Sequence, residues 1–372
     1  MTMSTFIRTL IEQEVLHRRR FLLAGAAGLG AMAVPGVFGK GRAMAATNDP
    51  ALAWSYRDRA TAYWNSVVSG GEAFAESLGK PKSALVNLIN EGSSEKSLSD
   101  LKSFLAKTGG NCAIACDAND SPNARPVVEA VKAANAYVST MWNKTDDLHP
   151  WDFGDNYVCH MTWSDVKPAE DTARILFEAM GGKGGVVHLG GIAANNPAIE
   201  RLQGLKNALA DFPEIELLDA QPADWDTTKA AALMSSYLTR YGDRITGVHC
   251  ASDQMAYGVI EALLAEGIDD MPIVSYDGNP EAVKLVQDGK LLATVYTNPY
   301  WGGGILTSLA YHAAIGTFKP SEEPNEHREF YGPTVLITQE DAAEFSAKYI
   351  DAVPDYDWND FWGPTNGQIQ YN

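Results

Sequence analysis

The carboxylate of Asp277 is the side chain of this sequence with the most chemical options. It lies in the segment SYDGNP (residues 275–280), after an apolar run and before a glycine turn and a helical stretch. At the carboxyl end of a strand, a carboxylate can serve as a catalytic base, a metal ligand, a helix cap or a hydrogen-bond acceptor for a ligand. Pro280 suits the first turn of the next helix, so Asn279 is the expected cap. This leaves Asp277 free to face a ligand.

Polar or aromatic residues follow several strand-like runs in the same way. They are Asn119, Trp142, Asn195, Ser252, Asp277 and Thr297. In open α/β sheets, ligands bind outside the carboxyl ends of the strands, so these side chains are predicted to share one cleft. Aromatic rings suit the C–H face of a sugar or polyol, and planar hydrogen-bonding groups suit its hydroxyl rim. The pattern indicates binding of a small polyhydroxylated molecule and requires no activated nucleophile.

The motifs of common enzyme classes are missing from the sequence. It contains no Walker P-loop, no G-x-S-x-G elbow, no H-E-x-x-H and no G-x-G-x-x-G after a strand. The segment DANDSPN (residues 117–123) lacks the glycine and the distal glutamate of a calcium loop. No metal, cofactor or catalytic residue is therefore expected, and an exported enzyme is kept only as an alternative.

Strand-like and helical runs alternate regularly along the chain. Expected strands cover residues 83–90, 112–118, 137–142, 185–191, 214–223, 245–252, 272–278 and 291–299, and expected helices cover 94–109, 124–136, 169–182, 196–213, 226–242, 253–267, 280–289 and 301–316. Residues 54–79 suggest a strand, a loop and a helix, whereas 143–163 look irregular. This alternation predicts parallel, doubly wound α/β sheets. The run is longer than one core usually holds, so two such lobes are expected.

Residues 1–45 have the three-part plan of an export signal. A basic cluster precedes an apolar stretch over residues 21–38 and a small-x-small end at residues 43–45. Arg18 and Arg19, followed by Phe21 and Leu22, resemble a twin-arginine signal. The alternative is a retained membrane anchor, for which about 18 residues are marginal. We expect a cleaved signal and export to the periplasm, by the twin-arginine route.

Charge and cysteine content narrow the possible partners. The net charge of −18 argues against binding to nucleic acid or to anionic lipid surfaces.

Cys112 and Cys116 lie four residues apart in one strand-like run, about 13 Å from each other, which is too far for a disulfide. Buried free thiols are expected, although a bridge between other pairs of the four cysteines stays open.

From Trp54 to about Thr338, the order of motifs resembles the periplasmic sugar-binding proteins of ABC importers, the ribose-binding type. The matching segments are GGIAANNPAIERLQGLKNAL, QPADWDTTKA, ASDQMAYGVIEALLAEG and VSYDGNPEAVKLVQDGKLLATVYTNP. The resemblance implies the type I periplasmic binding protein fold, with two doubly wound lobes joined by three crossovers. The expected division is lobe 1 at 46–163 plus 298–329, lobe 2 at 164–297 plus 330–350, and an aromatic tail at 351–372.

The resemblance also implies ligand contacts in lobe 2. Arg201 matches an arginine that reaches sugar hydroxyls, and Trp225 matches an aromatic residue that packs on the sugar ring. Tyr276 and Asp277 match a pair that closes on the sugar. The resemblance therefore places these four side chains against one ligand.

Other positions in lobe 2 depart from the family pattern. Ser252 stands where relatives often have asparagine, and the adjacent Asp253 is the expected cap of the next helix. Thr297 stands where relatives often have glutamine, with Asn298 beside it. Ser252, Thr297 and Asn298 are kept as expected ligand contacts.

In lobe 1, the implied contacts are Tyr63 and Trp64, which resemble an aromatic pair facing the sugar ring, together with Asn119. Trp142 and Asn143 fall where sugar-binding relatives often have an Asp-Arg pair. This departure removes a charged anchor, adds an aromatic face and argues against ribose itself. Arg57 and Asp58 precede the aromatic pair and could also enter the site.

The function implied is that of a monomeric periplasmic solute-binding protein. It would capture a sugar, polyol or cyclitol by hinge closure and deliver it to an ABC permease in the inner membrane. Two alternatives stay open: an exported sugar-active or cofactor enzyme, and a sensor protein that presents its ligand to a membrane receptor.

Overall fold

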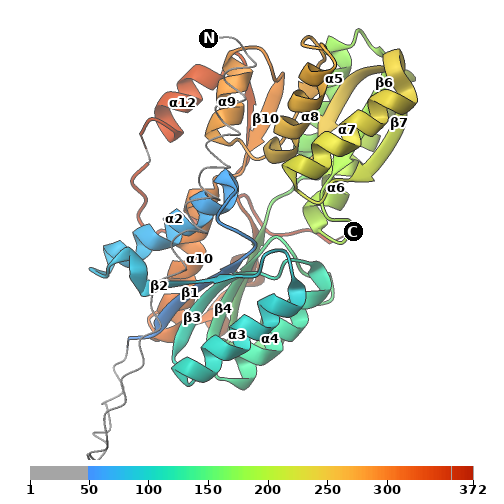
Figure 1. Cartoon of the computed structure of the whole chain (residues 1–372). Coiled ribbons are helices and arrows are strands. Elements are labelled where there is room, and N and C mark those ends of the chain that lie inside the picture. Colours follow the sequence, from blue (N-terminus) through green and yellow to red (C-terminus); the bar gives the residue numbers. More distant parts are fainter. Residues whose placement is uncertain (1–48, 353, 372) are drawn as a thin grey trace, which may run out of the picture.

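The computed structural model describes residues 49–352 and 354–371, and the chain forms two lobes (Figure 1). The predicted export signal at residues 1–45 lies outside the described residues. Within the described ranges, no helix combines the length and the apolarity that are needed to cross a membrane. All four cysteines are buried free thiols, as expected.

Lobe 1 is built on a six-stranded sheet in which every paired strand is parallel. In spatial order its strands are β11 (Glu329–Tyr331), β5 (Tyr157–Thr162), β4 (Tyr137–Met141), β3 (Cys112–Asp117), β1 (Ala51–Tyr56) and β2 (Leu85–Ile89). Its helices are α2 (Ala62–Ser77), α3 (Ser94–Thr108), α4 (Ala124–Ala133), α10 (Pro299–Ala314) and the short α11 (Asn325–Arg328). Helices α2 and α10 pack together on one face, around Trp54, Val67 and Ile305, while α3 and α4 cover the other face.

Lobe 2 repeats this architecture with a second six-stranded sheet. Its order is β12 (Val335–Thr338), β10 (Ala293–Tyr296), β9 (Ile273–Val274), β8 (Ile245–Cys250), β6 (Lys183–Gly190) and β7 (Glu214–Pro222). Only β12 runs antiparallel to its neighbour among these pairs. Helices α5 (Val166–Ala179) and α6 (Asn196–Leu209) lie on one face, and α7 (Thr227–Tyr241), α8 (Asp253–Ala265) and α9 (Pro280–Gln287) lie on the other, with α12 (Ala342–Tyr349) against the α9 side. The predicted α/β fold of two doubly wound lobes is confirmed.

The described chain passes between the two sheets after β5, after β10 and after β11, which gives the three crossovers that were expected. The predicted boundary between residues 329 and 330 is too early, because β11 pairs with β5 in lobe 1. Phe330 packs in the lobe 1 core and Glu329 is fully buried there, so this strand cannot belong to lobe 2. The segment 143–163 is also not wholly irregular, since it contains β5.

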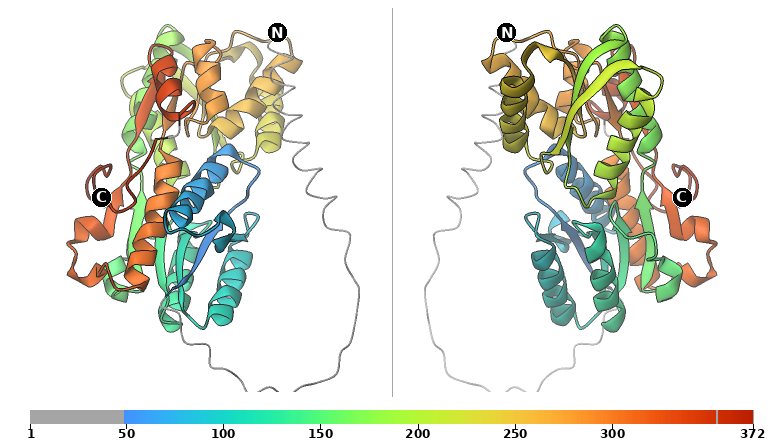
Figure 2. Two further views of the ribbon diagram at one scale, coloured as in Figure 1. Left: turned by 90° about the vertical axis from the view of Figure 1, so that its left-hand side faces the viewer. Right: turned by 90° about the vertical axis from the view of Figure 1, so that its right-hand side faces the viewer.

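The C-terminal tail returns from lobe 2 to lobe 1. Helix α12 packs on lobe 2 through Ala342 and Phe345, whereas Trp358 of the tail lies against Gly304 of α10 in lobe 1. Farther on, Gln368 forms an antiparallel bridge with Phe330. Figure 2 shows the end of the tail beside lobe 1. The tail thus covers the surface of lobe 1 and supplies none of the residues that line the cleft described next.

Candidate functional site

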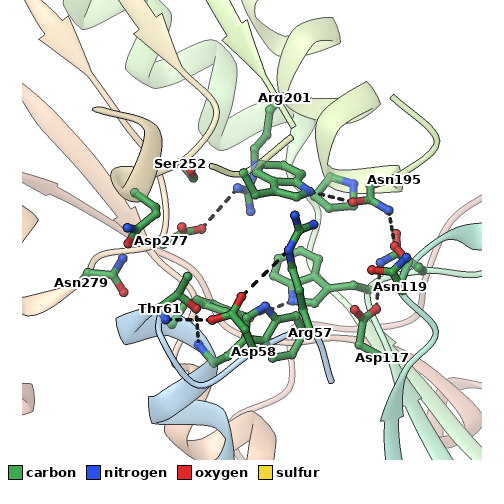
Figure 3. Close-up of a pocket in the computed structure, with 17 residues that line it drawn as sticks. Arg57, Asp58, Thr61, Asp117, Asn119, Asn195, Arg201, Ser252, Asp277 and Asn279 are labelled. Atoms are coloured by element: carbon green, nitrogen blue, oxygen red, sulfur yellow. Dashed lines mark hydrogen bonds and ion pairs between the residues drawn. The ribbon is translucent and has the colours of Figure 1, made fainter. Parts of the chain in front are cut away.

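A cleft lies between the lobes, where the carboxyl ends of strands from both sheets face each other (Figure 3). It holds about 670 Å³ of space, open solvent at its mouth included. Most of the predicted ligand-binding residues line it: Tyr63, Trp64, Asn119, Trp142, Asn143, Arg201, Trp225, Ser252 and Asp277. The rule that ligands bind at the carboxyl edge of such sheets therefore located the cleft from sequence.

Three predicted contacts do not line the cleft. Tyr276 is buried beneath it, where its hydroxyl donates to Asp165 Oδ1 at 2.6 Å. Thr297 is fully buried beside Tyr63, and its hydroxyl helps to lower the pKa of that phenol against the larger upward effect of burial. Asn298 caps α10 instead, and its amide bonds to the hydroxyl of Tyr356 in the tail. These three residues support the site from behind.

The start of α8 differs by one residue from the prediction. Ser252 is the N-cap, and its hydroxyl accepts a hydrogen bond from Met255 N at 3.3 Å. Asp253, the predicted cap, is fully buried and accepts hydrogen bonds from the hydroxyls of Ser275 (2.5 Å) and Thr294 (2.8 Å). Burial raises the pKa of Asp253 to about 7. Because Ser252 has extended backbone angles, the helix begins after it, and Asp253 ties β9 and β10 together.

Arg201 is the electrostatic centre of lobe 2. Its Nε donates to Asp165 Oδ2 at 2.8 Å, and its Nη1 donates to Ala251 O at 2.6 Å and to Asp277 Oδ1 at 3.3 Å. Burial raises the pKa of Asp277 well above its ordinary value, although the Arg201 guanidinium opposes this rise. A guanidinium held at two edges cannot reorient freely. Arg201 therefore fixes the position of Asp277 at the cleft wall.

Aromatic rings surround this guanidinium. Its central carbon lies 3.7 Å from the centroid of the Tyr276 ring, 5.4 Å from that of Trp142 and 5.6 Å from that of Trp225. Trp142 belongs to lobe 1, so the cation contacts rings from both lobes. Such cation–π contacts contribute about 0.5–2 kcal/mol each.

Trp142 and Trp225 both line the cleft, and the indole N–H of each donates a hydrogen bond to another residue of the protein. Trp142 Nε1 donates to the Tyr63 hydroxyl at 2.8 Å, and Trp225 Nε1 donates to Asn195 Oδ1 at 2.7 Å. These bonds fix the orientation of each ring. What the two tryptophans offer to a ligand is therefore their apolar faces and edges.

The backbone around the cleft is unusual. Four residues that line it have positive φ angles without being glycine: Asn119 (69°), Trp142 (60°), Trp225 (61°) and Asp277 (119°). Positive φ is uncommon for side chains other than asparagine and aspartate, and costs about 1–3 kcal/mol when a fold imposes it. Such residues gather at functional sites, and here they form the sharp turns that direct four side chains toward one space.

The position of the Trp225 ring depends on the absence of a side chain at Gly191, and this dependence can be tested. A Cβ atom on Gly191 would lie 1.9 Å from the Trp225 indole, so Gly191→Ala must displace that ring. We expect this substitution to weaken ligand binding about tenfold, which corresponds to roughly 1–2 kcal/mol of lost contact. Trp225→Ala should have a similar effect, and the double variant should bind no worse than Trp225→Ala alone. Isothermal titration calorimetry measures the affinity of all three variants. If the two single losses added up in the double variant, Gly191 would not act through the Trp225 ring.

The lobes touch each other along one side of the cleft. Asn195 Nδ2 donates to Asn119 O at 2.7 Å, and Ser121 Oγ donates to Asn196 Oδ1 at 2.7 Å. Elsewhere, Arg57 Nη2 donates to Asp224 O at 2.9 Å. The structure therefore shows the two lobes closed on each other.

Several cleft residues were not among the predicted contacts. They are Thr61, Asp117, Pro197, Gln254 and Asn279, whereas Asn195, Arg57 and Asp58, which also line the cleft, were anticipated in the sequence. Asp117 ends β3, so the strand-end pattern that selected Asn119 and Asn195 could also have selected it. Arg57 and Asp58 follow β1 in the same way.

The comparison with protein families agrees with this architecture. The model of the periplasmic binding protein domain matches residues 52–317. The chain therefore belongs to the periplasmic binding protein family, which confirms the resemblance seen in the sequence.

Its curated relatives include sugar-binding proteins. The chain is 28% identical to the ribose import binding protein of Escherichia coli K12 over 237 residues, 64% of this chain and 75% of that protein. It is 33% identical to the D-allose-binding periplasmic protein of the same organism, over 47% of this chain and 56% of that protein. For the ribose import binding protein of Salmonella typhimurium, the chain spans about half of that protein's length, 47%.

Solved structures share this fold. A crystal structure from Burkholderia phytofirmans, described as a twin-arginine translocation pathway signal protein, is 42% identical, with a TM-score of 0.83, and the match covers 86% of this chain and 98% of that one. A periplasmic solute-binding protein from Actinobacillus succinogenes, solved with bound D-allose, shares the fold at 23% identity, with a TM-score of 0.69 over 79% of this chain and 99% of that one.

Proposed function

We propose that this protein is the binding component of an ABC importer and captures a sugar, polyol or cyclitol. The observation that carries this proposal is the Arg201–Asp277 pair, which faces a closed cleft between aromatic rings from both lobes. A guanidinium donor and a carboxylate acceptor suit clustered hydroxyls, and the rings suit the C–H face of a sugar. Relatives named for ribose, allose and xylitol support this ligand class.

The mechanism is ligand-driven closure of the hinge. Lobe 1 supplies Tyr63, Trp64 and Trp142 to the cleft, and lobe 2 supplies Arg201 and Asp277. A ligand can contact both sets only when the lobes are closed, so its binding favours the closed state. A permease in the inner membrane then recognises this closed form. The proposed location is the periplasm, reached by the twin-arginine route, in keeping with residues 1–45 and with the Burkholderia relative.

A binding role also accounts for the cleft without catalysis. Arg201 and Asp277 are held by Asp165, Ala251 and each other, an arrangement that fixes hydrogen-bonding groups rather than moving protons. A handful of charge-assisted hydrogen bonds, at about 1.5–3 kcal/mol each, together with stacked rings, is enough for micromolar affinity.

The proposal is tested by screening neutral sugars and polyols with the purified protein lacking residues 1–45. The panel contains D-ribose, D-allose, xylitol and myo-inositol. At 100 times its Kd, a true ligand should add about 2.7 kcal/mol to the free energy of unfolding, measured as a rise in the thermal midpoint. Small-angle scattering should show a smaller radius of gyration with that ligand. A protein that is stabilised by none of a broad set of neutral sugars and polyols, or that converts them, would contradict the proposal.

A further inference from the structure

On the lobe 1 side of the cleft, Asp117, Asn119 and Asn143 form a group that we name the acceptor corner. Asp117 is the last residue of β3, Asn119 follows it, and Asn143 follows the neighbouring strand β4. All three line the cleft, and all are more than nine-tenths buried, with exposed fractions of 3%, 6% and 3%. Figure 3 shows Asp117 and Asn119 across the cleft from Asp277.

The amide N–H groups of this corner are already in use. Asn143 Nδ2 donates to Asp117 Oδ1 at 2.8 Å, and Asn119 Nδ2 donates to Gly92 O at 3.1 Å and to Ser94 Oγ at 3.0 Å. Carboxylate and carbonyl oxygens only accept, so these partners also fix which end of each amide is nitrogen. The amides therefore present their oxygens rather than their nitrogens.

Those oxygens are the distinctive feature of the corner. Oδ1 of Asn119 and Oδ1 of Asn143 are buried and accept no hydrogen bond from any residue that the structure describes. A buried acceptor without a donor costs about 1–3 kcal/mol. Two such atoms beside a buried carboxylate, in the wall of a cleft, are suited to a ligand that brings its own donors.

The charge of Asp117 is only weakly compensated. Among the described residues no cationic nitrogen lies within ion-pair distance of it. Burial has the largest effect and raises the pKa of Asp117 to about 6, against hydrogen bonds from the Asn143 amide and the Asn119 backbone that lower it; the more distant Arg57 also lowers it, and Asp120 raises it. Asp117 is therefore mostly ionised at neutral pH, and it makes the corner both acceptor-rich and negative.

We propose that the acceptor corner selects the ligand: it reads a pair of hydroxyl donors and rejects anionic groups. This inference rests on the proposed function and adds the substrate class to it. Asp277, which is paired with Arg201, is a carboxylate in the opposite wall, so a ligand that spans the cleft meets a carboxylate on both sides. A neutral sugar or polyol, with hydroxyls at both ends, satisfies both walls. A sugar phosphate or uronic acid places an oxyanion against one of them.

The test compares neutral and anionic probes on the wild type and on Asp117→Asn. The probe pairs are D-ribose with D-ribose 5-phosphate and D-galactose with D-galacturonate, together with D-allose, xylitol and myo-inositol as further neutral probes. Calorimetry at pH 8 should show the neutral ligand losing roughly tenfold to a hundredfold in affinity with Asp117→Asn, since the acceptor loses its charge. Binding of the anionic probes, weak or absent in the wild type, should stay the same or improve.

Controls separate this selection from a structural effect. Asp117→Asn is isosteric and keeps an oxygen for Asn143, and Asp100→Asn alters a partly exposed aspartate of the same lobe that does not line the cleft. A loss of equal size for neutral and anionic probes, or no loss for any neutral ligand, would overturn the acceptor corner while leaving the proposed function intact. If the wild type binds no neutral sugar or polyol at all, the proposed function fails, and the acceptor corner fails with it.

Discussion

Asp277→Ala is expected to weaken ligand binding at least about 100-fold and to leave the protein folded. The substitution removes the cleft-facing carboxylate and, with it, two or more charge-assisted hydrogen bonds to ligand hydroxyls, at about 1.5–3 kcal/mol each. It also frees Arg201 Nη1, which now donates to Asp277 at 3.3 Å, so the guanidinium loses one of its constraints. Calorimetric titration with the ligand found in the screen measures the loss.

The fold should tolerate this change, because the buried charge of Asp277 destabilises the folded state. Burial and the nearby carboxylates of Asp253 and Asp165 all raise its pKa, which shows that its charge is unfavourable there. The free energy of unfolding should change by less than about 2 kcal/mol, including the strain of alanine at positive φ. Asp288→Ala, at an exposed position of the same lobe, is the matched control and should bind normally. Wild-type affinity in Asp277→Ala would rule out the proposed role.

Arg201→Met should have the largest effect on stability of any single change in the cleft. Arg201 is 2% exposed, and Asp165, one of its partners, is fully buried. Removing one partner of a buried ion pair leaves uncompensated charge and costs about 3–5 kcal/mol. The matched control is Arg240→Met, which removes an exposed arginine from its pair with the partly buried Asp219 in the same lobe and should cost no more than about 1 kcal/mol. Urea unfolding measures both.

The stability deficit of Arg201→Met should depend on pH in a defined direction. In the wild type, Arg201 lowers the pKa values of Asp165 and Asp277 against the larger effect of burial, so without it both values rise further. A carboxyl group whose folded pKa exceeds its unfolded pKa binds its proton more tightly in the folded state, so the fold gains stability as pH falls through the folded value. The deficit should therefore be smaller at pH 5 than at pH 8. An equal deficit at both values would mean that the loss comes from packing alone.

The fold was predictable because its signal is local. Strand and helix alternate along the chain, each with its own hydrophobic period, and this pattern defined both lobes. Strand β5 was missed because its sequence, YVCHMT, is not a plain apolar run like that of β3, and it follows a stretch rich in Asp and Trp that looks irregular. The packing of the C-terminal tail could not be predicted, because the tail packs through single aromatic side chains, such as Trp358 on α10, that follow no hydrophobic period.

Site residues could be predicted from the sequence only where they directly follow a recognisable strand. Of the neighbours Tyr276 and Asp277, which both lie beyond the end of β9, only Asp277 lines the cleft. The sequence alone does not say which of two neighbours does so. The partner of Arg201, Asp165, is 36 positions away in another element, and nothing in the local sequence links the two. Asp117 was overlooked as a ligand contact because it was considered only as the first residue of a possible calcium loop, and its strand only through apolar residues and cysteines.

The positive φ angles around the cleft limit how this protein could be redesigned as a sensor for another solute. A library that randomised the cleft would treat its positions as equal. At residues 119, 142, 225 and 277, however, the backbone conformation limits which amino acids can be accommodated. Glycine, asparagine and aspartate fit such angles most readily, and β-branched residues fit them worst. Variation is better directed to Thr61, Ser252 and Gln254, which line the same cleft without positive φ. New specificity would then come from side chains, while the four turns that shape the cavity stay as they are.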